Sequence, residues 1–201
     1  MRVSEKSACI SIILCCYNSS ERLLLCLEHL AAQSGLNPDN AELVFVDNAS
    51  TDNSSETAVS IWRDLGARFP LKVVFEERQG LAFARVAGVL ASTYPLGIFC
   101  DDDNWLPKNY AIQVADIFCR YAEVGVIGSA SVPVSSANIP PWFYRLAPRL
   151  AVGSQADVSG DITASRSFVW GAGMAIRLDV LRAVFNAGIQ PRIVGRQGGT
   201  L

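Results

Sequence analysis

Residues 10–18 have the sequence Ile10-Ser11-Ile12-Ile13-Leu14-Cys15-Cys16-Tyr17-Asn18, an apolar run that ends in two polar side chains. A short apolar run with no polar alternation is typical of a strand buried on both faces, as strands in the middle of a parallel sheet are. We therefore expect a central strand at Ile10–Cys16, with Tyr17 and Asn18 just beyond its carboxyl end.

Outward from this strand, apolar runs of strand length alternate with longer segments of helical spacing. This alternation is typical of an α/β fold with a Rossmann-like, mostly parallel central sheet flanked by helices. The 201 residues suit a single domain. The expected strands are 10–16, 43–46, 72–75, 96–100 and 124–127, and the expected helices are 20–33, 53–66, 81–91, 107–121 and 178–187.

The composition argues against several classes of protein. The formal net charge is -2 and no long basic run occurs, so nucleic-acid binding lacks its usual electrostatic basis. The six cysteines lack the paired C-x-x-C spacing of a zinc site, and we expect reduced thiols in a cytoplasmic protein. No run approaches the roughly 20 apolar residues of a membrane span, and no signal peptide is visible.

Polar clusters follow three of the expected strands where each strand ends. Tyr17 and Asn18 follow the first, Asp47 follows the second, and Asp101, Asp102 and Asp103 follow the fourth. Ligands of open parallel α/β sheets bind beyond the carboxyl ends of the strands. The agreement in position predicts one ligand site along this edge.

The three consecutive aspartates predict a divalent cation, Mn²⁺ or Mg²⁺. Adjacent carboxylates repel one another unless a cation lies among them, and these hard cations prefer oxygen ligands. In an extended segment, Asp101 and Asp103 would point to one side, toward metal and diphosphate, and Asp102 to the other, toward sugar or ribose.

Two further residues have alternative interpretations. Asp47 either binds a nucleobase or ribose, or serves as a local turn or cap residue. Other residues nearby can also cap the following helix, namely Asn48, Ser50, Asp52 and Ser54. We therefore expect Asp47 to be spare, that is, not needed for capping and free to bind the ligand. Arg85 reaches either a diphosphate or one of the aspartates.

Together these segments resemble the family 2 glycosyltransferases, which have the GT-A fold. The resemblance runs from Ile10 to about Asn109, with a second patch at Trp170 to Arg177. The matching motifs are Ile12-Ile13-Leu14-Cys15-Cys16-Tyr17-Asn18, Val46-Asp47-Asn48-Ala49-Ser50-Thr51-Asp52, Gln79-Gly80-Leu81-Ala82-Phe83-Ala84-Arg85, Phe99-Cys100-Asp101-Asp102-Asp103-Asn104 and Trp170-Gly171-Ala172-Gly173-Met174.

The resemblance assigns roles to these residues. It places Cys15, Tyr17, Asn18 and Asp47 at the nucleotide, Asp103 at the metal with Asp101 beside it, and Arg85 and Asp102 at the donor. It also places Trp170, Gly171, Ala172 and Gly173 beside the acceptor. Residues 1–129 would then form the nucleotide-sugar half and 130–201 the acceptor half.

Two positions depart from the family pattern. Val86 occupies the place where an asparagine often follows the arginine. No Asp or Glu follows Asp179, so the family's acidic general base is absent from this sequence. Gly195-Arg196-Gln197-Gly198-Gly199 resembles the approach to the motif of that base. We therefore expect the base beyond Leu201, in a chain truncated at its C-terminus.

The resemblance implies an inverting, metal-dependent transfer from a nucleotide-diphosphate sugar, most commonly a UDP-sugar, to an acceptor hydroxyl. Such enzymes build cell-surface polysaccharide or glycolipid, so saccharide or lipid-linked acceptors and a peripheral location at the inner membrane face are compatible with it. A nucleotidyltransferase or a Rossmann dehydrogenase would need glycines after the first strand, and Cys15-Cys16-Tyr17-Asn18 has none. A non-catalytic nucleotide-sugar-binding module stays open as the alternative.

An aromatic stretch, Pro140-Pro141-Trp142-Phe143-Tyr144-Arg145, interrupts the second half. Aromatic rings with an arginine suit sugar stacking or a membrane interface. The alternative is a hydrophobic plug that packs on the sheet.

Overall fold

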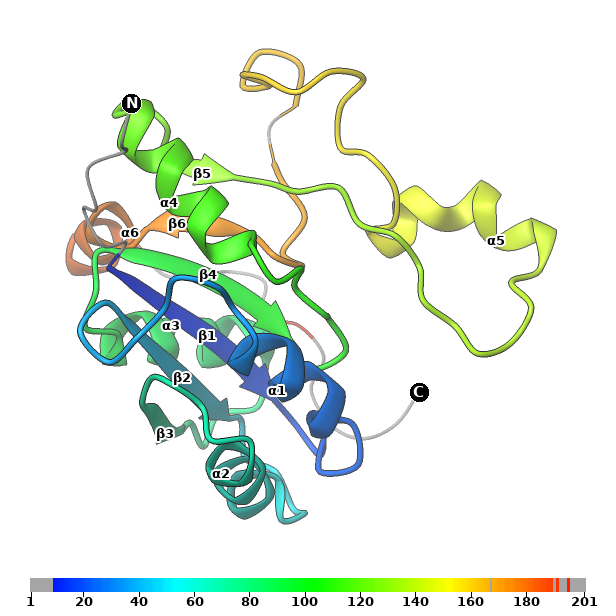
Figure 1. Cartoon of the computed structure of the whole chain (residues 1–201). Helices are drawn as coiled ribbons and strands as arrows, with labels where there is room; N and C mark the ends of the chain where they lie inside the picture. The colour runs from blue at the N-terminus through cyan, green and yellow to red at the C-terminus, as the bar shows by residue number, and fades with distance from the viewer. Residues whose placement is uncertain (1–8, 167, 190, 192–194, 196–201) are drawn as a thin grey trace.

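The computed structural model describes residues 9–166, 168–189, 191 and 195. Its centre is a six-stranded sheet in the order β3-β2-β1-β4-β6-β5 (Figure 1). The strands are β1 (Ile10–Cys16), β2 (Ala41–Asp47), β3 (Leu71–Phe75), β4 (Leu96–Asp101), β5 (Val126–Ile127) and β6 (Ala175–Arg177).

The first four strands are parallel, and β6 runs antiparallel to both β4 and β5. The predicted α/β fold with a mostly parallel sheet is therefore confirmed. Because β6 comes from the second half of the chain and lies between strands of the first, residues on both sides of Ser129 build one sheet.

Helices cover both faces of the sheet. They are α1 (Leu23–Ala31), α2 (Ser54–Asp64), α3 (Leu81–Ala91), α4 (Tyr110–Arg120) and α6 (Leu178–Asn186). A further helix, α5 (Pro141–Leu146), lies away from the sheet (Figure 1). Alternate residues of β1 divide the core: Ile12 and Leu14 pack with α1, α2 and α4, whereas Ile13 packs with α3 and α6. This division explains why β1 is apolar at every position except Ser11, whose buried hydroxyl donates to Glu42 (2.6 Å).

One glycine sets the distance between a helix and the sheet. A Cβ atom at Gly88 of α3 would lie 2.4 Å from Cγ2 of Ile13 and 3.1 Å from Cγ2 of Val46. The missing side chain lets α3 pack directly on β1 and β2, which brings the start of α3 to the edge where both strands end.

Several element bounds differ from the prediction. α1 begins at Leu23 rather than residue 20, because Ser19–Arg22 form a turn in which the Arg22 N–H donates to the Ser19 carbonyl (2.8 Å). Pro107 lies in a turn before α4 rather than in its first helical turn, since the Tyr110 N–H donates to the Pro107 carbonyl.

The proline-rich stretch also differs from the prediction of a loop. It contains α5 and a 3-10 helix, η1 (Ala147–Leu150), and α5 has no buried residue. The hydrophobic plug is therefore wrong: the aromatic side chains do not pack on the sheet.

Candidate functional site

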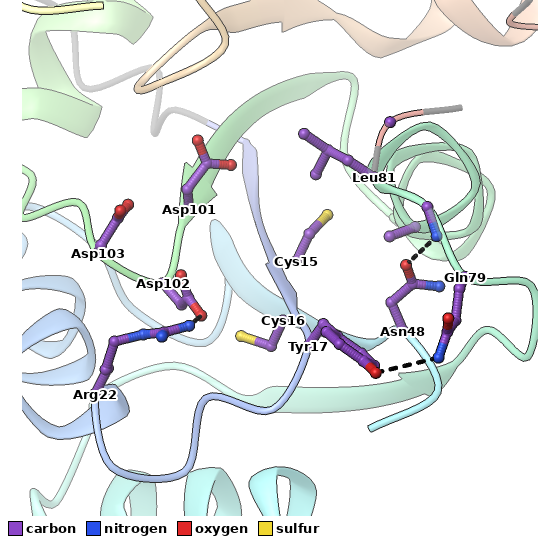
Figure 2. A pocket seen from close by; sticks show the side chains of 13 residues that line it. Cys15, Cys16, Tyr17, Arg22, Asn48, Gln79, Leu81, Asp101, Asp102 and Asp103 are labelled. Atoms are coloured by element: carbon purple, nitrogen blue, oxygen red, sulfur yellow. Dashed lines mark hydrogen bonds and ion pairs between the residues drawn. The ribbon is translucent and has the colours of Figure 1, made fainter. Parts of the chain in front are cut away.

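A cavity of about 420 Å³ opens at the carboxyl ends of β1, β2 and β4. Figure 2 shows the three aspartates on one side of it and, on the other, Gln79, which precedes α3, and Leu81, the first residue of α3. The lining residues are Cys15, Cys16, Tyr17, Arg22, Asn48, Gln79, Gly80, Leu81, Ala84, Asp101, Asp102, Asp103 and Gly195. The structure thus brings five of the predicted site residues together: Cys15, Tyr17, Asp101, Asp102 and Asp103.

Asp101 is the last residue of β4, and Asp102 and Asp103 form the turn that follows. The expected extended conformation therefore ends at Asp101. Burial raises the pKa of the Asp101 carboxyl, as do the charges of Asp103 and Asp102, while Arg85 lowers it. Negative charge on Asp101 is thus unfavourable, and a cation at the cavity would relieve this.

Asp102 turns toward the start of α1 (Figure 2). Its Oδ2 accepts hydrogen bonds from Nη2 of Arg22 (2.7 Å) and from the hydroxyl of Ser19. The Arg22 side chain remains 56% exposed. The sequence did not reveal the role of Arg22, because 80 residues separate it from Asp102 and only the fold brings the two side chains together.

Arg85 lies beneath the loop that was expected at the acceptor. Its Nη2 is 3.5 Å from Oδ1 of Asp101, which is the ion pair of one predicted alternative. Binding of a diphosphate by Arg85 stays a prediction. A Cβ atom at Gly171 would lie 2.4 Å from that same Nη2, so only glycine leaves room for the guanidinium. The Nε of Arg85 is buried without a hydrogen-bond partner in the part of the chain that the structure describes.

The remaining residues of the expected acceptor loop lie in the same connection before β6. The Trp170 N–H donates to Oε1 of Gln155 (2.7 Å), Ala172 is in a turn, and the Gly173 carbonyl accepts the Tyr110 hydroxyl. Of the predicted approach to the base motif, Gly195 lines the cavity and residues 196–199 lie outside the described residues.

Asp47 and Asn18 lie at the same edge but do not line the cavity. Oδ1 of Asp47 accepts the Ser50 N–H (2.8 Å) and Oδ2 accepts the Ser55 hydroxyl (2.6 Å). The expectation that Asp47 is spare is therefore wrong, because it organises the turn before α2. Asn18 accepts the Thr51 N–H (2.8 Å), which joins the loops after β1 and β2.

The wall opposite the aspartates depends on Asn48, whose role the sequence did not reveal. Its Nδ2 donates to the carbonyls of Glu76 (3.2 Å) and Arg78 (2.7 Å), and its Oδ1 accepts the Gly80 N–H (2.7 Å). Gln79 then donates to the Tyr17 hydroxyl (3.3 Å). One buried amide thus places the segment that leads into α3.

The cavity holds neutral thiols. Burial raises the pKa of Cys15 to about 12 and that of Cys16 well above its ordinary value. Cys15 and Cys16 are both free thiols. Cys15 therefore faces the cavity as a small neutral group and not as a thiolate nucleophile.

No group of three His, Cys, Asp or Glu side chains in the described residues is placed to hold a metal ion by itself. Mg²⁺ commonly uses one or two carboxylates and completes its coordination with water and phosphate oxygens. The carboxylates of Asp101 and Asp103 beside a cavity fit that mode of binding. No described helix has the combination of length and apolar sequence needed to cross a membrane.

Comparison with known proteins supports the resemblance to family 2 glycosyltransferases that the sequence motifs indicate. A family model described as glycosyl transferase family 2 matches residues 11–185. The protein EpsH of Bacillus subtilis, which is named as a glycosyltransferase, is 30% identical over 121 residues, or 56% of this chain and 33% of EpsH.

Solved structures share the fold. S. aureus TarS 1–349 in complex with UDP has a TM-score of 0.64 at 20% identity, over 90% of this chain and 49% of that one. The mannosyltransferase PcManGT from Pyrobaculum calidifontis, in complex with GDP-Man and Mn²⁺, has a TM-score of 0.65 at 20% identity, over 88% and 46%. The fold is thus the GT-A fold, and the matches cover about half or less of the length of these relatives.

Proposed function

The chain belongs to glycosyl transferase family 2, and on that premise we propose that it transfers a sugar from a nucleotide-diphosphate sugar to an acceptor hydroxyl, with inversion. The observation that carries the proposal is the cavity of about 420 Å³ at the carboxyl edge of the sheet, with Asp101, Asp102 and Asp103 on its wall. Its place and its acidic wall suit a nucleotide diphosphate that arrives with a cation.

The nucleoside would lie toward β1 and β2. Cys15 and Tyr17 would contact the base, with Asn18 and Asp47 at the rim. Each carboxylate oxygen of Asp47 already accepts one hydrogen bond and can accept a second, so its role in the turn leaves capacity for a base or ribose.

The diphosphate would lie at the aspartates. We propose Mn²⁺ or Mg²⁺ as the cofactor, held by Asp103 and Asp101; the Mn²⁺ bound with GDP-Man in PcManGT supports this choice. When bound, the cation neutralises charge that develops on the departing diphosphate. Arg85 orients Asp101 through their ion pair, and Arg22 holds Asp102 away from the metal ligands.

The acceptor would approach the loop of Trp170, Gly171, Ala172 and Gly173, which lies over Arg85. Deprotonation of its hydroxyl requires a general base. The only described carboxylates that line the cavity are the three aspartates, so we assign the base to a segment beyond Leu201. Residues 1–129 would mainly bind the donor and 130–201 would face the acceptor.

A UDP-sugar is the first donor to test, supported by the UDP complex of TarS. We propose a saccharide or lipid-linked acceptor in cell-surface polysaccharide or glycolipid synthesis, at the cytoplasmic side of the membrane. The alternative is a non-catalytic nucleotide-sugar-binding module, which would bind donor without transferring its sugar.

The test is thermal unfolding with UDP, GDP, dTDP and CDP, each with and without Mn²⁺. At 100 times Kd, a ligand specific for the folded state contributes about 2.7 kcal/mol, which corresponds to a rise of roughly 5–10 °C for a domain of this size. We expect such a rise with one nucleotide, dependent on metal and lost in Asp103→Ala. The matched control is Asp39→Ala, an exposed aspartate outside the cavity. No rise with any nucleotide would refute the donor site.

A further inference from the structure

Residues 132–152, here called the aromatic excursion, leave the sheet and return to it (Figure 1). Their ends are joined by a pair of backbone hydrogen bonds, from the Ser131 N–H to the Gly153 carbonyl (3.0 Å) and from the Gly153 N–H to the Ser131 carbonyl (2.9 Å). Ala147 is the only buried residue of α5 and η1. The excursion is thus anchored at its base and exposed along its length.

The exposed side chains of the excursion are largely apolar. Trp142 is 53% exposed and Tyr144 62%, and Phe143 between them contacts both rings, at centroid distances of 6.4 Å and 5.7 Å. Val132, Val134, Leu146 and Leu150 are exposed as well. Such a concentration of exposed apolar side chains marks an interaction surface.

The charge of this region indicates the partner. Residues 124–156 contain no Asp or Glu, whereas Arg145 and Arg149 are both exposed within the excursion of a chain whose net charge is -2. Trp and Tyr rings favour the membrane interface, where arginines reach the headgroups. A positively charged surface is attracted to anionic lipid and disfavours a second copy of itself.

We propose that the aromatic excursion docks the protein on an anionic lipid bilayer. The base of the excursion also connects to the candidate acceptor loop: Gln155 donates to the Ser129 carbonyl (2.8 Å) and accepts the Trp170 N–H (2.7 Å). Docking would therefore bring that loop toward the lipid surface. Only this last consequence, delivery of a lipid-linked acceptor, rests on the proposed function.

The test is co-sedimentation of the 201-residue chain with vesicles of phosphatidylcholine alone or mixed with phosphatidylglycerol. We expect binding to the mixed vesicles that weakens with salt. Each arginine near an anionic surface contributes about fivefold, so Arg145→Gln with Arg149→Gln should weaken binding about 30-fold. Trp142→Ser with Tyr144→Ser should weaken it at least about tenfold.

The matched control is Arg63→Gln with Phe75→Ser, which removes a similarly exposed arginine and aromatic ring (side chain of Arg63 72%, Phe75 66%) outside the excursion. This variant should bind as the unaltered chain does. All variants change exposed side chains, so an unchanged melting temperature confirms that they are folded.

Three results would overturn the proposal. The first is no binding to the mixed vesicles, and the second is equal binding to vesicles of phosphatidylcholine alone. The third is a loss of binding in the Arg63→Gln with Phe75→Ser control as large as that in the excursion variants. A dimer in sedimentation velocity that Trp142→Ser abolishes would also overturn it, since the surface would then join two copies. Nucleotide-dependent stabilisation is measured without lipid, so failure of docking and failure of the donor site are distinguishable.

Discussion

Replacing Asn48 by alanine should weaken both the fold and the donor site, because this amide holds the segment opposite the aspartates. The side chain makes three hydrogen bonds, to the carbonyls of Glu76 and Arg78 and from the Gly80 N–H. At about 1 kcal/mol net for each bond, the loss is about 3 kcal/mol. Water in the adjoining cavity can replace part of it, which leaves about 2 kcal/mol.

A second buried amide provides the matched control. Gln33 accepts the Ala111 N–H (3.0 Å) and donates to the carbonyls of Pro107 (2.8 Å) and His29 (3.1 Å), but it does not line the cavity. Gln33→Ala should therefore lower the free energy of unfolding by about 3 kcal/mol and leave nucleotide binding unchanged.

The assay is urea unfolding with and without UDP and Mn²⁺. If UDP at 100 times Kd stabilises the unaltered chain and Gln33→Ala by about 2.7 kcal/mol, a tenfold loss of affinity in Asn48→Ala reduces that gain to about 1.4 kcal/mol. Equal nucleotide gains in the two variants would refute the reasoning, since the segment at Gly80 would then not shape the site.

Two further predictions concern the loop before β6, which is proposed to face the acceptor. Gly171→Ala should displace the Arg85 guanidinium, open its ion pair with Asp101 and lower the free energy of unfolding in urea by about 1 kcal/mol. In the control Gly125→Ala, the new Cβ meets nothing within 4 Å, so the free energy of unfolding should change little. Equal losses in the two variants would contradict the packing argument. Burial raises the pKa of Tyr110, so its contribution to stability is complete below the ordinary value of 10.0 and is lost as pH rises through the higher folded-state value. Compared with the unaltered chain, Tyr110→Phe should therefore lose less stability above pH 10. In the titration of tyrosine ionisation at 295 nm, it should lack the contribution of Tyr110 at high pH. An unchanged titration would contradict this assignment.

The parallel part of the fold was predictable because its strands are apolar runs that can be recognised without knowledge of their neighbours. β1 is apolar on both faces apart from Ser11 and is buried at every position, and α3 has the predicted bounds, Leu81–Ala91. β5 lies within the expected strand 124–127, whereas β6 has three residues and is too short for any periodicity to be visible. The antiparallel pairing of both strands depends on contacts between distant segments. α5 could not be predicted because its apolar residues do not lie on one buried face.

The candidate site was predictable where a residue ends a strand, as Asp101 does, or directly follows one, as Tyr17 does. It was not predictable where a side chain acts across the fold. Asn48 was assigned to capping, yet it binds the segment that leads into α3, and Asp47 was expected to be spare, yet it organises its own turn. Polar residues in a turn have several possible partners, and the tertiary structure selects among them.

The backbone bridge between Ser131 and Gly153 has an evolutionary consequence. Because the two ends of the excursion already face each other as paired residues, a short turn could join them without moving β5 or the loop before β6. Insertions and deletions at this position therefore leave the nucleotide edge of the sheet undisturbed. Homologous chains can therefore vary in the aromatic excursion while the cavity at the sheet edge is retained. Chimeras that exchange the excursion between two such proteins would exchange the surface to which each protein binds.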